Sequence, residues 1–274
     1  MNRQVPNKTY TIVGDGKVAR HMMHYFNLVG ISFNQWQRKQ STKQLQQTVA
    51  QSDVVLILIS DDAIQTFIQV NPFLQNKTLV HFSGTLVIDN VFGCHPLMTF
   101  GQDLYALETY QNIPFVCDEG VVFNNLFPQL QNQSFNIPAA QKAYYHAMCV
   151  MAGNFTQTLM RESANHLHEN LGLPVDILFP YLLQNTQNFI NNPKQSATGP
   201  IQRRDFTTVK KHLQVLEGDN LAGIYKSFLK FSKTLSSNTC HPRECGDPES
   251  SETLDSRFHG TDKSGARFCS EEAI

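Results

Sequence analysis

A glycine-rich turn between an apolar strand and an amphipathic helix constrains the fold of this chain more than any other feature. Thr9–Val13 is a short apolar segment, the pattern Gly14-x-Gly16-x-x-Ala19 follows it directly, and a helical apolar pattern begins at Val18. The first glycine permits a tight turn, the second leaves room for a pyrophosphate, and Ala19 allows the helix to pack closely on the sheet. The N–H groups at the start of the helix favour phosphates. The pattern predicts a dinucleotide site, with a purely structural turn as the alternative.

Two further segments bear on which dinucleotide would bind. An acid normally follows the second strand of such a fold and holds the ribose hydroxyls of NAD, but this chain has Arg38 and Lys39 there instead. The basic residues could hold the 2′-phosphate of NADP, or form an ordinary solvated pair. Ser60 and Asp61 follow the third strand, where α/β sheets place ligands. We expect the side chain of Asp61 or Asp62 to cap the next helix and the backbone of this segment to lie near the cofactor. We predict NADP as cofactor, with contacts from Gly14, Asp15, Gly16, Lys17, Val18, Arg38, Ser60 and Asp61.

The remaining pattern predicts the fold class. Further strands are expected at residues 30–33, 54–59, 78–82, 91–94 and 113–117, alternating with short helices, one of which starts at the capping box Ser41–Gln44. After Pro138 the pattern becomes helical, over residues 139–171, 175–190 (kinked at Pro180), 207–216 and 220–235. The sequence predicts an α/β fold in which a Rossmann-type parallel-sheet domain, residues 1–138, precedes an all-α domain, residues 139–235.

The last part of the chain has a different composition. Residues 236–274 are polar and charged and lack an apolar period, so we expect this tail to be disordered. The segment His241–Pro248 resembles translated dispersed bacterial DNA repeats, which suggests that the tail is an appendage without chemistry.

Composition excludes several classes of protein. There are 22 Lys+Arg and 23 Asp+Glu, so no basic excess indicates a nucleic-acid partner. The aliphatic run at residues 54–59 is too short to span a bilayer, and the first residues contain no apolar stretch of signal-peptide type. Six cysteines are too few for a disulfide scaffold, and the histidines lack metal-ligand spacing. We expect a cytoplasmic protein with no membrane, nucleic-acid or metal partner.

Several segments carry a resemblance to a known family. They are His81-Phe82-Ser83-Gly84, Gly93-Cys94-His95-Pro96, Tyr144-Tyr145-His146-Ala147 with Gly153-Asn154, and Ala197-Thr198-Gly199-Pro200. They resemble a bacterial family of Rossmann-like proteins with a C-terminal helical domain of unknown function. Arg204 departs from the family, which tends to have glycine there. More remotely, the chain is similar to pyrroline-5-carboxylate reductase and ketopantoate reductase. Those enzymes use NADP(H), and their helical domains supply substrate contacts and often the dimer interface.

The resemblance implies an NADP(H)-dependent oxidoreductase acting on a small carbonyl, imine or hydroxy compound. A non-catalytic dinucleotide-binding sensor or partner protein is the alternative, because one fold hosts both kinds of function. The candidate catalytic residues are His95, His146 and Asn154. His146 and Asn154 lie eight positions apart on the expected long helix, about 80° apart around its axis. We expect His146 or His95 to be the general acid and Asn154 to orient the substrate, although His146 could instead be a core residue.

A polar loop of the helical half is the expected substrate anchor. Thr198, Gly199 and Arg203 are its candidate residues, and Arg203 could clamp a carboxylate in a bidentate fashion. The alternative is a structural ion pair between Arg203 and Asp205. The helical half also has more apolar faces than it can cover alone, so we expect a homodimer formed through it.

Overall fold

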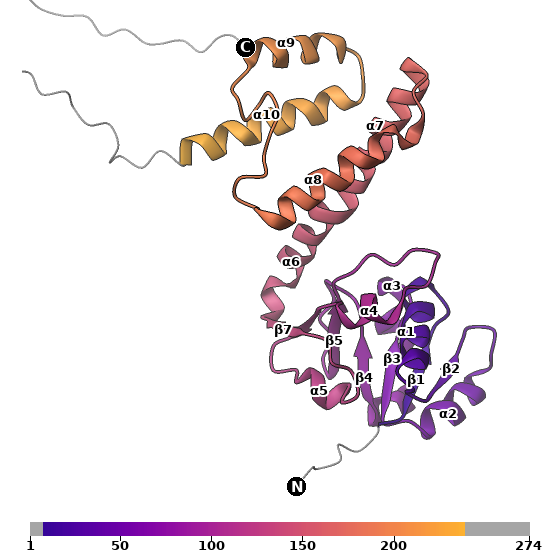
Figure 1. Cartoon of the computed structure of the whole chain (residues 1–274). Coiled ribbons are helices and arrows are strands. Elements are labelled where there is room, and N and C mark those ends of the chain that lie inside the picture. The colour runs from indigo at the N-terminus through magenta and orange to yellow at the C-terminus, as the bar shows by residue number, and fades with distance from the viewer. Residues whose placement is uncertain (1–7, 239–274) are drawn as a thin grey trace, which may run out of the picture. The chain divides into compact units, whose positions relative to one another are not determined.

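The computed structural model of the chain describes residues 8–238 (Figure 1). It divides into two compact units, Met1–Leu178 and Phe179–Ile274. The last described strand ends at Ile137, close to the predicted change at Pro138, whereas the boundary between the compact units comes later. The predicted domain limits therefore stay a prediction. The disordered tail predicted for residues 236–274 lies outside the described residues, apart from its first three.

The first unit is built on a mostly parallel sheet, as predicted. Its described strands are β1 (Tyr10–Val13), β2 (Phe33–Trp36), β3 (Val54–Ile57), β4 (Thr78–His81), β5 (Val91–Pro96), β6 (Phe115–Asp118) and β7 (Ser134–Ile137). Their order is β2-β1-β3-β4-β5-β6-β7, and β5 and β6 form the antiparallel pair. Strand order reverses between β1 and β3, and open α/β sheets bind ligands at such a switch point. The antiparallel pairing of β6 and the existence of β7 are departures from the predicted pattern.

Helices cover the sheet and continue the unit beyond β7 (Figure 1). They are α1 (Lys17–Leu28), α2 (Thr42–Ala50), α3 (Asp61–Val70), η1 (Pro72–Asn76), α4 (Leu107–Gln111), α5 (Phe123–Leu126), η2 (Ala139–Gln141), α6 (Lys142–Cys149), η3 (Val150–Phe155), α7 (Thr156–Leu171) and η4 (Val175–Leu178). The predicted capping box is confirmed, because Gln44 N–H donates to Ser41 Oγ while Ser41 N–H donates to the Gln44 side chain. The predicted long helix is interrupted by η3, a π-helical segment.

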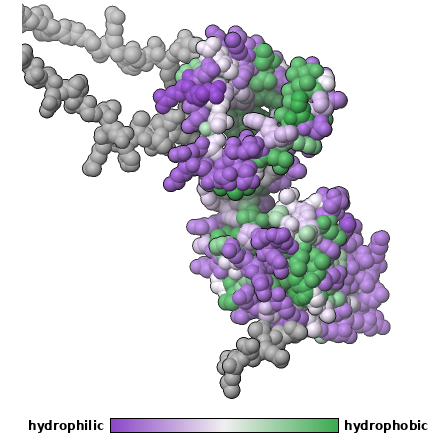
Figure 2. Space-filling model, viewed as in Figure 1, coloured by the Kyte–Doolittle hydropathy of each residue, from purple (hydrophilic) through white to green (hydrophobic). Residues whose placement is uncertain are grey.

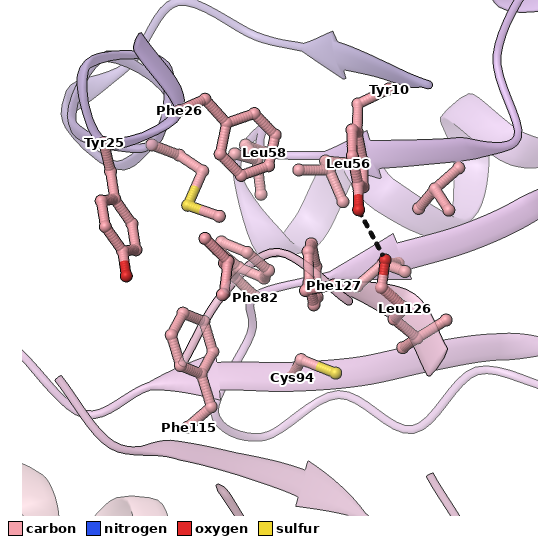
Figure 3. Packing of buried hydrophobic residues seen from close by; sticks show 14 of the residues in the cluster. Tyr10, Tyr25, Phe26, Leu56, Leu58, Phe82, Cys94, Phe115, Leu126 and Phe127 are labelled. Atoms are coloured by element: carbon pink, nitrogen blue, oxygen red, sulfur yellow. Dashed lines mark hydrogen bonds between the residues drawn. The ribbon is translucent and has the colours of Figure 1, made fainter. Parts of the chain in front are cut away.

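Two apolar clusters bury the central strands from both sides. Side chains of one cluster, including Tyr10, Phe26 and Phe127, lie between α1 and the sheet (Figure 3). Tyr10 stacks on Phe127 with ring centroids 5.9 Å apart, and its hydroxyl donates to the Leu126 carbonyl over 2.9 Å. Phe26 is fully buried, which stabilises the fold by about 2 kcal/mol. The other cluster includes Leu45 of α2, so the strands that end at the switch point are fixed on both faces.

The second unit is helical in its described part. Its helices are α8 (Phe179–Asn191), α9 (Phe206–Val215) and α10 (Leu221–Asn238). The kink expected at Pro180 is wrong. The α-helix starts at Phe179 rather than at Val175, so Pro180 lies in its first turn, where a missing N–H breaks no helical hydrogen bond. Among the described residues, no helix is both long and apolar enough to cross a membrane.

The loop before α9 explains the departure at Arg204. Arg204 has φ of 55°, in the left-handed region, which costs a residue with a Cβ about 1–2 kcal/mol. Glycine adopts this conformation without that penalty, so the backbone gives a reason to expect glycine at this position. Asp205 follows as the N-cap of α9 and accepts hydrogen bonds from the Thr208 N–H over 3.0 Å and the Thr208 hydroxyl over 2.7 Å. Hydrogen bonds from Thr208 lower the pKa of Asp205, with a smaller contribution from the charge of Arg203, so an electrostatic pairing of Arg203 with Asp205 remains an alternative.

Candidate functional site

A cavity of about 1000 Å³ opens at the switch point of the first unit. The loops that follow β1, β2 and β3 line it, together with Phe82 and Ser83 after β4. Every cofactor contact predicted from the sequence is among its lining residues: Gly14, Asp15, Gly16, Lys17, Val18, Arg38, Ser60 and Asp61. The structure thus brings together residues from three separate segments, as a single extended ligand would require.

Gly14 joins the first loop to the neighbouring strands. Its φ of 132° is one that side chains rarely adopt, and a Cβ at this position would collide with the carbonyl oxygen of Leu58. Its N–H donates to the Trp36 carbonyl over 2.9 Å, and the Leu58 N–H donates to the Val13 carbonyl over 2.8 Å. Gly14 is therefore required by the fold itself, because the loop crosses directly above the end of β3.

Gly16 has a different role. It is the N-cap of α1, with φ of −69°, and no described heavy atom lies within 4 Å of the place where its Cβ would be. Since Gly16 has no side chain and the first turn contains no acid, the N–H groups at the start of α1 are left for another acceptor. The open space in front of Gly16 and the positive end of the helix fit an anionic group such as a pyrophosphate.

The far end of the cavity combines an apolar wall with two cations. Trp36 packs on Phe67 with ring centroids 5.7 Å apart, and its indole N–H donates to the Ser41 carbonyl over 3.2 Å. Arg38 and Lys39 lie two and three residues after Trp36, are exposed, and line the same cavity. A flat apolar ring and a phosphate could both be accommodated at this end.

The end of β3 differs from the sequence-based expectation. Ser60, not Asp61 or Asp62, is the N-cap of α3, so the predicted aspartate cap is wrong. Asp61 Oδ2 instead accepts a hydrogen bond of 2.5 Å from the Ser83 hydroxyl, and Ser83 Oγ accepts from the Leu86 N–H over 3.0 Å. The Asp61 carboxylate is thereby tied to the end of β4, at the edge of the cavity.

His95 and His146, fifty-one positions apart, meet beside this edge. Their rings pack edge to face with centroids 5.7 Å apart, and His95 Nδ1 shares a hydrogen bond of 2.8 Å with the Tyr145 hydroxyl. A Cβ on Gly84 would collide with the His146 ring. Because Gly84 directly follows the cavity residue Ser83, this cluster of His95, Tyr145 and His146 adjoins the cavity.

The surroundings of the cluster set its protonation. Burial lowers the pKa of His95 to about 4, with smaller contributions in the same direction from His146 and Lys142. His95 is therefore a neutral imidazole at pH 7. Burial also raises the pKa of the Tyr145 hydroxyl, which stays protonated.

The other candidate residues lie elsewhere. Asn154 is exposed within η3, and the α-helical estimate of 80° between it and His146 does not apply across a π-helical segment. Thr198, Gly199 and Arg203 belong to the second unit. There the Arg203 N–H donates to the Gly199 carbonyl over 3.1 Å, and Gly199 has φ of 94°.

Sequence reasoning missed Tyr145 as a member of the cluster. The available signal was its place one residue before His146, on the same helical face as Lys142. It also missed Ser83 and Phe67, whose roles depend on contacts between distant segments. Within the described part of the chain, no group of three His, Cys, Asp or Glu side chains could hold a metal ion.

Comparison with known proteins agrees with this geometry. The first unit has a Rossmann-type fold, and a helical region follows it. Residues 119–230 match the family model described as a domain of unknown function, DUF2520, and carry that domain. The resemblance to a Rossmann-like family of unknown function is confirmed. No curated protein matches the chain.

Three solved structures share the fold. A candidate NADP oxidoreductase from Bacteroides fragilis is 20% identical with a TM-score of 0.63, and the match covers 85% of this chain and 97% of that one. A protein from Thermotoga maritima is 20% identical, with a TM-score of 0.61 and coverage of 84% and 98%. Pyrroline carboxylate reductase from Plasmodium falciparum, solved with NADP bound, is 14% identical, with a TM-score of 0.53 and coverage of 85% and 98%.

The two glycines give a test of the cavity. Gly14→Ala should lower the free energy of unfolding by about 3 kcal/mol, because it combines strain with a backbone collision. Gly16→Asp should leave that free energy nearly unchanged, since aspartate is a favoured N-cap. It should weaken NADPH binding about 100-fold, because it places a carboxylate in the anion position. Urea unfolding and fluorescence titration measure the two effects. Unchanged NADPH binding by Gly16→Asp would show that the cavity is not the cofactor site.

Proposed function

We propose that the chain is an NADP(H)-dependent oxidoreductase that acts on a small carbonyl, imine or hydroxy compound. The observation that carries the proposal is the continuity of the cavity with the histidine cluster. Ser83 lines the cavity, and the next residue, Gly84, lies against His146. A dinucleotide that extends from Arg38 past Gly16 toward Ser83 would end beside groups able to exchange a proton. The structural neighbours, one of them solved with NADP, support this class of reaction.

The residues lining the cavity fit a dinucleotide with a 2′-phosphate. Arg38 and Lys39 supply positive charge where NAD-binding folds usually place an acid. Asp15, Gly16, Lys17 and Val18 would surround the pyrophosphate, and Ser60 and Asp61 would approach the remaining ribose. The bound cofactor would supply the hydride that this reaction class requires.

The protein would supply the matching proton and the orientation. We assign the general acid to His146, because burial lowers the pKa of His95 and so disfavours its imidazolium form. The Tyr145 hydroxyl would donate to His95 Nδ1, which leaves the proton of His95 on Nε2, available as a hydrogen-bond donor. Asn154 remains a proposed orienting donor. In the oxidative direction, His146 would accept the proton instead.

The loop of Thr198, Gly199 and Arg203 remains the proposed substrate anchor. The guanidinium of Arg203 could hold a substrate carboxylate through two parallel hydrogen bonds, in competition with its electrostatic interaction with Asp205. This part of the proposal favours substrates with an acid group. We also place the protein in the cytoplasm, where the buried free thiols of Cys94 and Cys117 would stay reduced.

We further propose a homodimer formed by the helical part of the chain. Apolar surface is visible on the helical part of the chain (Figure 2). Exposed apolar side chains on these helices include Tyr144, Met148, Met151, Phe155, Phe179, Tyr181, Leu183, Phe189 and Ile190. Helix α8 contains no Asp, Glu, Lys or Arg, and Leu183 is 72% exposed. A helix surface that is uncharged along its whole length suits an identical surface, because a two-fold contact pairs each patch with itself.

The cofactor preference tests the role of Arg38. Wild-type protein should bind NADPH more tightly than NADH, and Arg38→Ala should reduce this preference about tenfold or more, since a hydrogen bond to a charged group is worth about 1.5–3 kcal/mol. The binding of NADH should change little, which provides an internal control. Isothermal titration with both cofactors measures the effect. Equal affinities in the wild type would refute the choice of NADP.

The catalytic assignment needs a substrate, which a screen of carbonyl and imine compounds by NADPH absorbance can supply. His146→Ala should then lower turnover about 100-fold or more, the usual contribution of general acid catalysis. His95→Ala and Asn154→Ala should lower it less, with NADPH affinity unchanged in all three variants. His168→Ala, on α7, is the control. If all three variants turn over at the wild-type rate, the non-catalytic dinucleotide-binding protein becomes the better interpretation.

Sedimentation tests the dimer. Wild-type protein should sediment as a dimer at micromolar concentration. Leu183→Arg should shift it toward the monomer, because the partner surface offers no counter-charge. The matched control is Gln47→Arg on α2, which is exposed and lies in the first unit. A monomer mass that does not change with concentration would exclude the dimer.

A further inference from the structure

A buried ion pair lies beside the cluster of His95, Tyr145 and His146. Lys142 Nζ is 2.6 Å from Asp118 Oδ1 and also donates to the carbonyl oxygen of Leu86. The Lys142 side chain is 4% exposed and that of Asp118 is 17% exposed. Lysine is seldom buried to this extent, and a buried pair of this kind is weak evidence for stability alone. Its place next to the candidate site therefore suggests another role.

The sheet provides the space for this pair. Asp118 Oδ2 accepts a hydrogen bond of 2.7 Å from the Gly93 N–H. A Cβ at Gly93 would lie 2.5 Å from both Lys142 Nζ and Asp118 Oδ2. The charged groups of Lys142 and Asp118 thus occupy the space that a side chain at Gly93 of β5 would fill. Gly93 and His95 are two residues apart on one strand, so the pair and the imidazole lie on the same face of the sheet.

The spacing on α6 connects the pair to the cluster. Lys142, Tyr145 and His146 stand at positions i, i+3 and i+4, so they share one helical face. Lys142 is the first residue of α6, and its contacts with Asp118 and Leu86 tie that end of the helix to the sheet. Fixing Lys142 sets the rotation of the helix, and with it the positions of Tyr145 and His146 relative to His95.

The charges around the cluster add an electrostatic effect. His95 faces His146 and Lys142 from α6 and Asp61 from α3. Lys142 in turn faces Asp118 and the fully buried His81, whose Nε2 has no hydrogen-bond partner among residues 8–238. The positive charge of Lys142 disfavours a second positive charge on the imidazole of His95 or of His81.

We propose that Lys142 is a positioning residue of the candidate site: its ion pair with Asp118, seated over Gly93, fixes the face of α6 that presents Tyr145 and His146 to His95. The inference rests on the proposed function, because positioning matters only if the cluster takes part in a reaction. The position of His95 relative to Tyr145 can, however, be measured in the protein without any substrate.

Two variants separate charge from position. Lys142→Met combined with Asp118→Asn removes both charges and leaves neither one buried and unpaired. Gly93→Ala keeps both charges but must displace them, because the added methyl group occupies their space. NMR of the imidazole nitrogens, assigned with His95→Asn, reports the pKa of His95 and its hydrogen bond to Tyr145. NADPH affinity and turnover are measured on the same samples.

The double variant should raise the pKa of His95, because a nearby positive charge is lost, and should alter its Nδ1 signal. Gly93→Ala should alter the Nδ1 signal without the same rise in pKa. Both should lower turnover about 100-fold, the effect expected for a displacement of about 1 Å, while NADPH affinity stays at the wild-type value. Lys43→Met, which removes an exposed charge on α2, and Gly223→Ala, whose Cβ has open space on α10, are matched controls without effect.

An unchanged His95 signal and pKa in both folded variants would overturn the proposal and leave the ion pair a structural contact. If the double variant does not fold, Gly93→Ala alone decides by the same signal. If the wild type reduces no substrate at all, the proposed function fails, whereas the His95 signal still reports whether Lys142 positions the cluster.

Discussion

The close approach of the first loop to the end of β3 is the constraint on which the rest of the first unit depends. Gly14 lies so near the Leu58 carbonyl that no side chain fits between them. Because the loop crosses there, the N-terminus of α1 faces outward at the switch point, and the cavity opens beside it. Strands β1 and β3 are buried on both faces, which fixes Gly14 and Leu58 at their ends. The position of the cavity is therefore set by the sheet.

Much of this arrangement could be predicted from sequence because it is local. A strand, a two-glycine turn and a helix follow one another within twenty residues, and their order already defines the phosphate-binding end of the site. The capping box of Ser41 and Gln44 is equally local, and it was found with both of its hydrogen bonds. To place Arg38 and Lys39 in the site, the prediction also had to assume that the second strand ends near the first loop. The parallel pairing of β1 with β2 confirms this assumption.

The other half of the site could not be predicted because it depends on contacts between distant segments. His95 and His146 were candidates on residue type, but nothing in the sequence showed that their rings touch or that burial keeps His95 neutral. Lys142 would ordinarily be read as a solvated charge at the start of a helix. Its partner Asp118 lies on β6, a strand whose antiparallel direction has no local signal. The cap assigned to Asp61 or Asp62 was wrong for a similar reason, since the Asp61 carboxylate accepts a hydrogen bond from Ser83, which follows another strand.

The π-helical segment η3 divides one continuous helical run into two parts with different phases. Residues up to Cys149 keep the periodicity that suits the sheet, and residues after Phe155 follow a new one. A change of sequence on α7 can therefore alter what that helix contacts without rotating Tyr145 and His146. Such a segment lets the face that carries Tyr145 and His146 stay constant while the rest of the helix changes, so that two properties encoded in one element can evolve separately.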